Sequence, residues 1–591
     1  MPTESRQPGQ DVDLVVVGSG AAALAAAATA SVHGARVLVL EKTALIGGTS
    51  ALSGGEIWIP CSRQAREAGL ADSAHAVEVY LRSLQGDTLD TMRLRAFLQA
   101  APQALQWLEQ HTQLRYALMP GSADYHSGLP GASQGGRSLA VLPFDGRRLG
   151  DQLQRLRPPL RNALIFGGIS VCTRLDLPRL LNAGRSPAAA WYAARLIGRG
   201  WLDRLAGHPR GLRLTNGNAL VGRLLATLRE RGVTVLTEAR VQTLLAEDGA
   251  VRGVEFEQAG TRHRVLARRG VVLATGGCSA SADRRARHYP HVRGGGAHHA
   301  LPPEGNDGDA FALAEPLGVA EPAIPMRPAA WVPVSLVPGG PGGPAPFPHF
   351  SDKGRPGMLA VGPDGRRFVN ESLSYHEFGS AMIERGFDRA WLLADHRTLR
   401  RYGLGAVRPF PSPIGTHLRS GYLQRGATWL ELGRLLGLSG ERLQATVDRF
   451  NEHAMRGLDP EFRRGESVFE RRYGDAAHGP NPALGPLTQP PFYAIQVMPG
   501  DIGTFIGLPT DGAARVLDAS GRPVAGLYAA GNAALSLFGG HYPSAGITLG
   551  PALTFGWLAA RHALGHADLP AVPTPEVLGD TRHAAAADPI A

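Results

Sequence analysis

The chain has 591 residues, a length that allows several domains or one large enzyme. Its hydrophobic content of 43% supports a buried core, and 19% charged residues is too low for a disordered chain. The three cysteines, Cys61, Cys172 and Cys278, are widely spaced, which excludes a disulfide scaffold, a cysteine zinc site and a cysteine-ligated iron–sulfur cluster. We therefore predict no bound metal.

The net charge of +10 raises the question of an anionic partner. No basic run is interleaved with aromatic residues, so we expect no nucleic acid. No stretch reaches about 18 apolar residues without charges, so no spanning helix is expected. The N-terminus lacks the apolar region of a signal peptide. These features predict a soluble, cytoplasmic protein.

The clearest pattern is a βαβ unit near the N-terminus. An apolar strand at 14–17 leads into Gly18-Ser19-Gly20, an alanine-rich helix extends to about residue 33, and a second strand at 36–40 ends at Glu41. An acidic residue 23 positions after the first glycine is the spacing of a dinucleotide fingerprint. The alternative is a glycine-rich turn in an ordinary α/β sheet.

Each residue type in this unit has a physical reason. Gly18 permits the tight turn, and Gly20 lets the backbone approach a pyrophosphate at the positive end of the helix. Glu41 is placed to accept hydrogen bonds from a ribose, which favours a cofactor without a 2′-phosphate. The predicted residues here are Gly18, Gly20, Ala21, Ala22, Glu41 and Lys42.

The segment after the acid distinguishes FAD from NAD. Apart from Leu52, residues 47–55 are small or carry hydroxyls. With the later segments 237–241, 271–277 and 526–532 (GLYAAGN) they resemble the fumarate reductase/succinate dehydrogenase flavoprotein superfamily. The resemblance implies FAD, held non-covalently because no histidine occupies the loop that carries one in covalent relatives. It also implies these cofactor contacts: Gly48, Thr49, Ser50, Ser53, Gly54, Gly55, Val241, Ala274, Thr275, Gly276, Asp309, Gly531, Asn532, Ile547 and Leu549.

A narrower resemblance concerns the substrate. The run 48–60 (GTSALSGGEIWIP), the pair Tyr125-His126, the segment 365–371 with Tyr375 after it, and the run 540–546 (GHYPSAG) are similar to motifs of 3-ketosteroid Δ1-dehydrogenases. That family has a discontinuous Rossmann-like FAD domain with an inserted α+β catalytic domain. The resemblance therefore implies an α/β enzyme that desaturates a 3-ketosteroid at C1–C2.

The resemblance also assigns four catalytic positions. Tyr375 would remove the proton at C2, and Tyr125 would hydrogen-bond this base. Tyr542 and the N–H of Gly546 would hold the C3 carbonyl oxygen, while flavin N5 would accept a hydride from C1. The chemistry is reasonable, because an enolate needs donors aimed at its oxygen and a tyrosine of pKa about 10 needs help to act as a base.

Other classes stay open at this stage. A fumarate reductase-like enzyme needs cations to clamp two carboxylates, and Arg137 and His541 are candidates, although Arg137 is as easily a loop anchor. A ketosteroid dehydrogenase of different regiochemistry and a non-catalytic electron carrier are further alternatives. No second dinucleotide fingerprint is evident, so the expected reoxidant is a diffusible, quinone-like acceptor rather than NADPH.

The motifs predict a discontinuous organisation. The FAD domain takes 11–299 and returns at 499–570, a catalytic domain takes 300–498 with helical patterns near 377–400 and 428–456, and 571–591 is a flexible tail.

Residues 150–212 form an insertion with its own character. Within it, 187–205 predicts a basic amphipathic helix with two tryptophans. Such a helix suits peripheral contact with a membrane, and the competing interpretation is a surface helix packed on its own domain or on a neighbouring subunit.

Overall fold

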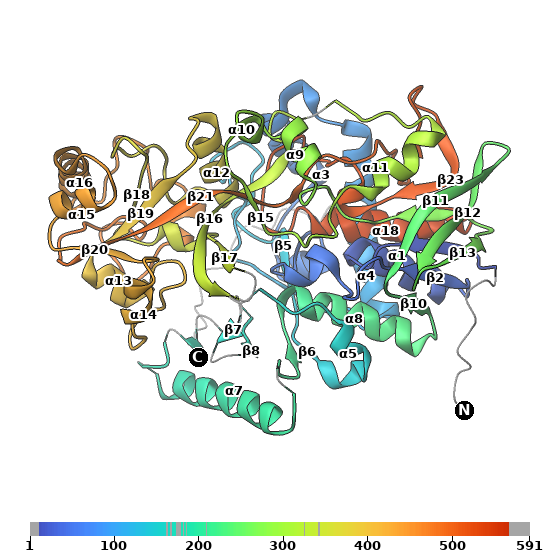
Figure 1. The fold of residues 1–591 in the computed structure, drawn as a ribbon, viewed down its shortest axis with the longest axis horizontal. Coiled ribbons are helices and arrows are strands. Elements are labelled where there is room, and N and C mark those ends of the chain that lie inside the picture. The colour runs from blue at the N-terminus through green and yellow to red at the C-terminus, as the bar shows by residue number, and fades with distance from the viewer. Residues whose placement is uncertain are drawn as a thin grey trace, which may run out of the picture.

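The structure is a computed structural model, and it describes residues 11–160, 164–165, 168–172, 176, 179–180, 182–184, 186–208, 210–323, 325–340 and 343–566. Two large sheets lie side by side, each with its own helices (Figure 1). The predicted tail, 571–591, lies outside the described residues.

The first sheet has nine strands and carries the N-terminal βαβ unit. Its spatial order is β10 (Thr234–Leu236), β2 (Val37–Leu40), β1 (Leu14–Val17), β14 (Val271–Leu273), β23 (Pro523–Ala529), β12 (Ala250–Gln258) and β11 (Ala239–Glu247), with β13 (Thr261–Leu266) on β12 and β22 (Arg515–Leu517) on β23. The first five of these strands are parallel. Both faces are covered, which is why β1 and β2 are continuous apolar runs.

Helices α1 (Ala21–Val32) and α18 (Leu549–Ala563) pack on this sheet. α4 (Thr91–His111) packs on α18, and α8 (Asn216–Glu230) packs on α1. Alanines allow the close approach of α1, since eleven of its twelve residues are buried. α18 follows the predicted 540–546 motif directly, so the C-terminal part of the chain returns to the N-terminal fingerprint.

The second sheet is largely antiparallel. Its order is β17 (Gly343–Pro348), β16 (Ala329–Gly340), β21 (Phe492–Thr504), β19 (Ala390–Ala394) and β18 (Met358–Val361), with β15 (His299–Ala300) and β20 (Gln424–Gly426) on β21. α12 (Tyr375–Glu384) packs against β16, and α15 (Trp429–Leu435) packs against α16 (Gly440–Ala454). The helical prediction near 428–456 is confirmed.

The helical prediction near 377–400 is only partly right. α12 ends at Glu384, the strand β19 follows, and α13 (His396–Tyr402) begins after it. All five residues of β19 are buried between two packed layers, so the run shows no alternation. A short apolar run of this kind does not distinguish a buried strand from a helix.

Three small sheets and several helices accompany the two large sheets. A three-stranded sheet is formed by β3 (Glu56–Trp58), β5 (Ser138–Val141) and β4 (Tyr116–Leu118), and two-stranded pairs by β6 (Phe144–Asp145) with β9 (Arg213–Leu214) and β7 (Leu164–Ile165) with β8 (Ile169–Ser170). The other α-helices within the described residues are α2 (Arg63–Glu67), α3 (Ala74–Gln85), α5 (Gln152–Arg155), α7 (Pro187–Leu205), α9 (Ala282–His288), α10 (Pro290–Arg293), α11 (Asp309–Ala314), α14 (Gly415–Arg419) and α17 (Val468–Tyr473).

The domain limits at 299/300 and 498/499 stay predictions. β21 extends across the second of them, from the second sheet to the turn that leads back toward the first. Among the described residues, no helix is long and apolar enough to cross a membrane.

Candidate active site

The N-terminus of α1 is built to receive an anion. Gly20 caps the helix without a side-chain hydrogen bond, and the Ser50 hydroxyl accepts from the N–H of Ala21 at 2.9 Å. Gly18 has φ +107°, and a Cβ there would lie 2.3 Å from the carbonyl oxygen of Ala274. Only glycine fits at this crossing of β1 and β14, as the fingerprint requires.

Glu41 ends β2 at the edge of the same cleft. It is 8% exposed and accepts hydrogen bonds from the Ser19 hydroxyl at 2.5 Å and from the N–H and hydroxyl of Thr43 at 2.9 Å. These donors fix the carboxylate where a ribose would meet it. The neighbouring Lys42 ammonium lies 2.5 Å from carboxylate oxygens of both Asp307 and Asp309, so those carboxylates already hold it.

One cavity of about 1070 Å³ joins this cleft to the second sheet. It is lined by every predicted site residue except Ile547, which is buried beside the lining residue Thr548. Sequence reasoning missed several lining residues, among them Asn306, Met119, Phe350, Phe469 and Arg472. Asn306 lies in the GNDGD turn, and that turn was the available signal.

The cofactor end of the cavity fits FAD. The side-chain oxygens of Thr275 and Asn306 are buried and have no partner within the described ranges, which leaves them for the polar atoms of a ligand. A Cβ at Gly48 would meet nothing within 4 Å, so open space lies above this backbone. Val241 of β11 borders the same space at the far side.

Three tyrosines gather at the other end of the cavity, next to the second sheet. The ring centroids of Tyr375 and Tyr542 lie 5.1 Å apart, those of Tyr125 and Tyr542 5.7 Å, and those of Tyr125 and Tyr375 5.9 Å. Gly546 lies beside them with φ +93°, and a Cβ there would be 2.4 Å from the carbonyl carbon of Ile57. The four positions predicted from separate parts of the sequence therefore lie together.

Burial sets the acidity of these hydroxyls. It raises the pKa of Tyr542 to about 12 and raises the pKa values of Tyr375 and Tyr125 well above the ordinary tyrosine value. After burial, the nearness of Tyr125 and Tyr542 raises the pKa of Tyr375 most. At neutral pH all three hydroxyls are therefore protonated in the protein alone.

Arg137 belongs to the support behind the tyrosines. Its guanidinium is 2% exposed and binds Asp124 and Asp72, each at 2.7 Å. Asp124 also accepts from the indole N–H of Trp58, and Tyr125 donates its N–H to the carbonyl of Pro543. Arg137 is thus a buried loop anchor, and its saturated guanidinium does not clamp a dicarboxylate.

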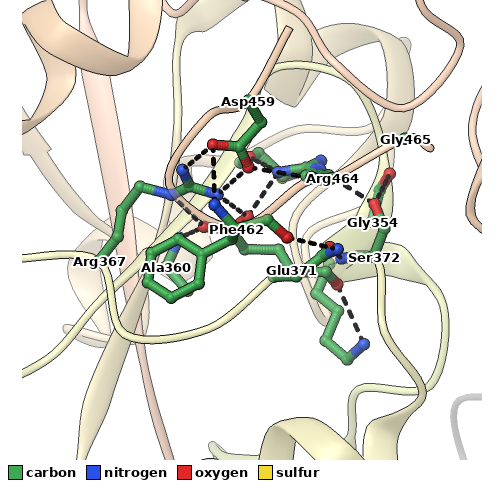
Figure 2. Close-up of polar contacts among 12 residues, drawn as sticks. Gly354, Ala360, Arg367, Glu371, Ser372, Asp459, Phe462, Arg464 and Gly465 are labelled. Atoms are coloured by element: carbon green, nitrogen blue, oxygen red, sulfur yellow. Dashed lines mark hydrogen bonds and ion pairs between the residues drawn. The ribbon is translucent and has the colours of Figure 1, made fainter.

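A second buried network holds the segment before Tyr375 (Figure 2). Arg367 binds Glu371 at 2.9 Å and Asp459 at 2.7 Å, while Arg464 binds Glu371 at 2.9 Å and donates to the Ser372 hydroxyl. The side chains of Glu371 and Arg464 are fully buried. Because Ser374 then caps α12, the network fixes the start of the helix at which Tyr375 sits.

Lys353 also holds the segment that precedes Tyr375. Its ammonium donates to the carbonyls of Glu371 and Leu373 and lies over the Phe378 ring. Burial lowers the pKa of Lys353 to about 7.

Aromatic side chains form the walls around the tyrosines. The Phe350 ring meets Tyr375 edge-on at 5.1 Å, and the Phe469 ring lies 4.9 Å from that of Tyr125. The resulting chamber has aromatic walls and a few hydroxyl donors, an arrangement that suits a hydrophobic ketone.

Comparisons with known proteins agree with this geometry. A family model described as "FAD binding domain" matches residues 13–549. The chain is 37% identical to 4-oxocyclohex-2-ene-1-carboxylate 5-dehydrogenase of Sinomonas cyclohexanicum, over 93% of each chain. It is 35% identical to 3-oxosteroid 1-dehydrogenase of Mycobacterium tuberculosis, covering 94% of this chain and 98% of the relative.

Solved structures give the same result. The 3-ketosteroid Δ1-dehydrogenase of Sterolibacterium denitrificans, in complex with 1,4-androstadiene-3,17-dione, superimposes with a TM-score of 0.85 at 35% identity, covering 94% of this chain and 99% of that one. A flavocytochrome c3 fumarate reductase, 20% identical with a TM-score of 0.61, shares the fold over 95% of this chain and 79% of its own.

The fold, the cofactor cleft and these matches define an FAD-dependent oxidoreductase. The chain belongs to the FAD-binding family of flavoproteins, among the relatives of the 3-oxosteroid 1-dehydrogenases. The predicted α/β fold and the predicted cofactor, FAD, are confirmed.

Proposed function

We propose that this enzyme introduces the C1–C2 double bond into 3-ketosteroids. The observation that carries the proposal is the meeting of Tyr125, Tyr375, Tyr542 and Gly546 at one end of a cavity whose other end fits FAD. Bound FAD supplies the acceptor for the hydride from C1.

The chain's own residues perform the proton chemistry in this proposal. The Tyr542 hydroxyl and the Gly546 N–H hold the C3 oxygen as negative charge develops on it, and one such donor contributes about 2.7–4 kcal/mol. Tyr375 takes the C2 proton, with Tyr125 stabilising its phenolate. The rings of Phe350 and Phe469 lie against Tyr375 and Tyr125, and these apolar neighbours make the interactions stronger than in solvent.

A second candidate substrate class comes from the Sinomonas relative, whose name specifies a single-ring ketone with a carboxylate. Desaturation beside a ketone needs the same tyrosines. The substrate body differs, since a single ring fills less of an aromatic-walled chamber than four fused rings do. We propose the steroid because the aromatic rings of Phe350 and Phe469 line the chamber in contact with Tyr375 and Tyr125.

The test is anaerobic mixing of the FAD-loaded enzyme with a 3-keto-4-ene steroid. Bleaching of the oxidised flavin absorbance and a product lighter by two hydrogens are expected, while the corresponding 1,4-diene is the control ligand that bleaches nothing. Bleaching by 4-oxocyclohex-2-ene-1-carboxylate but not by steroid would assign the second class. A flavin that responds to neither ketone would indicate an electron carrier.

The pH dependence of kcat/KM follows from the tyrosine pKa values. The base acts deprotonated, and burial places its pKa above 10, so the active fraction of free enzyme grows tenfold per pH unit. We expect log kcat/KM to rise with a slope near one from about pH 6 to about pH 10, without a plateau. A step near pH 7 that vanishes in Lys353→Gln would instead assign the profile to that lysine.

We also propose that α7 docks on a membrane that supplies the steroid. Its buried face, made of Ala189, Ala193, Leu196 and Gly200, packs on its own insertion. The opposite face presents Trp191, Trp201, Leu202 and Leu205, which are 54–81% exposed. Figure 1 draws α7 at the edge of the molecule, apart from both sheets.

Two further observations support a lipid surface as the occupant. Arg195 and Arg199 flank the exposed apolar face, which suits anionic headgroups. Val171 and Leu180, from the same insertion, line the cavity, so the segment that would meet the membrane also borders the substrate chamber.

Flotation with vesicles of equal parts phosphatidylcholine and phosphatidylglycerol tests this contact. The double variant Trp191→Glu/Trp201→Glu is expected to lose at least about tenfold in partitioning, because it replaces two interfacial anchors with charges. Phe410→Glu/Met455→Glu, at exposed positions elsewhere, carries the same charge change and should float like the native protein. Equal flotation of all three proteins would contradict membrane docking.

For reoxidation we propose a diffusible, quinone-like acceptor. The chain carries one dinucleotide fingerprint, and that fingerprint is already assigned to FAD.

A further inference from the structure

One part of the cavity lining, here called the rim, carries two guanidinium groups that form no ion pair with any described residue. The described residues of this rim belong to three segments: 119–122, 352–355 and 472–476. Two carboxylates lie there, and both are already bound. Asp352 accepts from His349 at 2.7 Å, and Asp475 accepts from Arg401 at 2.5 Å and from the Tyr402 hydroxyl at 2.6 Å.

The two guanidinium groups of the rim, unlike its two carboxylates, have no partner of opposite charge within hydrogen-bonding distance among the described residues. Arg355 donates to the carbonyl of Gly474 at 2.5 Å and forms no ion pair in the part of the chain that the structure describes. Arg472 is exposed at the end of α17, and within the described ranges it has neither an ion-pair nor a hydrogen-bond partner. These two cations therefore lie at the mouth of a chamber whose inner walls are aromatic.

Arg472 is held close to the wall of the cavity. A Cβ on Gly121 would lie 2.7 Å from the Arg472 Nη1 atom, so the guanidinium rests directly over this glycine. Gly121 itself lines the cavity, in the loop that continues to Tyr125. The absence of a side chain at 121 is what brings the charge against the substrate space.

An aromatic layer separates this charge from the tyrosines. The rings run from Tyr125 to Phe469 at 4.9 Å and from Phe469 to Tyr473 at 4.6 Å, and Arg472 lies beside the last of them. A ligand that places a ketone at Tyr542 and an anion at Arg472 must therefore extend past two aromatic rings. In a single-ring keto acid the carboxylate is opposite the ketone on the same ring and would end within the apolar layer.

We propose that Arg472, assisted by Arg355, binds a carboxylate at the end of the substrate remote from the ketone. The preferred substrates are then 3-ketosteroids with an acidic side chain on the D ring. This inference rests on the proposed steroid desaturation. It adds a specificity-determining residue that takes no part in the chemical step.

The experiment compares three 3-keto-4-ene steroids with the FAD-loaded enzyme. The first carries a C17 side chain that ends in a carboxylate, the second is its methyl ester, and the third carries a C17 ketone. The ester keeps the size of the acid and removes its charge. Steady-state kcat and KM are measured for the native enzyme, Arg472→Gln, Arg472→Glu and the control Arg471→Gln, whose guanidinium donates to the carbonyl of Gly465 outside the cavity lining.

Arg472→Gln should raise KM for the acid about tenfold with kcat almost unchanged, and Arg472→Glu should raise it further, because a charged hydrogen bond is lost and then replaced by repulsion. Rates with the ester and the ketone should change less than about twofold, which also shows that the variants are folded and hold FAD. High salt should weaken the binding of the acid alone.

Two results would overturn the inference while leaving the proposed function intact. One is an equal loss with acid and ester in Arg472→Gln, which would make Arg472 a packing residue. The other is an unchanged KM for the acid in both Arg472 variants. Failure of all three steroids to react with native enzyme would instead reject steroid desaturation itself.

Discussion

Tyr375→Phe is expected to lower kcat by about 10²–10⁴-fold, the range that a positioned general base contributes. The substitution removes one hydroxyl and keeps the ring that packs against Tyr542 and Phe350. Steroid should therefore still bind, as a perturbation of the flavin spectrum will report. Anaerobic stopped-flow measurement of flavin bleaching isolates the affected step.

Two companion variants make this result specific. Tyr542→Phe should cost about 2.7–4 kcal/mol, the effect of one oxyanion donor. Tyr493→Phe removes a buried hydroxyl whose partner is His396, far along the second sheet, and should retain the native bleaching rate. A Tyr375→Phe enzyme that bleaches at the native rate would show that another group takes the C2 proton.

Arg464→Met is expected to lower the free energy of unfolding by about 3–5 kcal/mol, because it breaks a buried ion pair. The Arg464 side chain is fully buried and satisfies Glu371, the Ser372 hydroxyl and two backbone carbonyls (Figure 2). Methionine of similar length donates to neither the Ser372 hydroxyl nor the two carbonyls, and it leaves Glu371 with only Arg367 and the Ala360 N–H as donors. Urea unfolding followed by circular dichroism measures the loss.

The adjacent residue is the matched control. Arg463 is 79% exposed and pairs with Glu466 on the surface, so Arg463→Met should cost no more than about 1 kcal/mol. Arg464→Met should also reduce kcat in folded enzyme, since the network orients the start of α12. Equal stability of the two variants would show that the buried network contributes little.

Low pH should weaken the buried network of Arg367, Glu371 and Arg464. Its charged partners hold the pKa of Glu371 below the ordinary glutamate value in the folded protein. The stabilisation is therefore present above the unfolded pKa of about 4.3 and is lost as the pH falls through the lower folded value.

Local patterns accounted for the nucleotide fingerprint at the cofactor end of the site. The strand β1, the glycine turn and α1 are contiguous in sequence, and their residue types follow from the backbone geometry that a pyrophosphate requires. The tyrosines were found through resemblance, because no local pattern marks a buried tyrosine as a base. Arg137 illustrates the limit: its sequence context allowed a substrate clamp or a loop anchor, and only its contacts with Asp72 and Asp124 decided between them.

By itself, then, the sequence determined the nucleotide fingerprint and the amphipathic helix at 187–205, since each depends on residues within a few turns of one another, and a resemblance over several distant segments identified the class of cofactor. Only the tertiary structure revealed that 390–394 is the strand β19, that Arg367 pairs with Asp459, and that the Arg472 guanidinium lies over Gly121. Those features join residues from 92 to more than 300 positions apart, or depend on burial from two sides. Long-range packing creates these features. Hydrophobic periodicity depends only on residues that are near one another in the sequence, so it does not predict them.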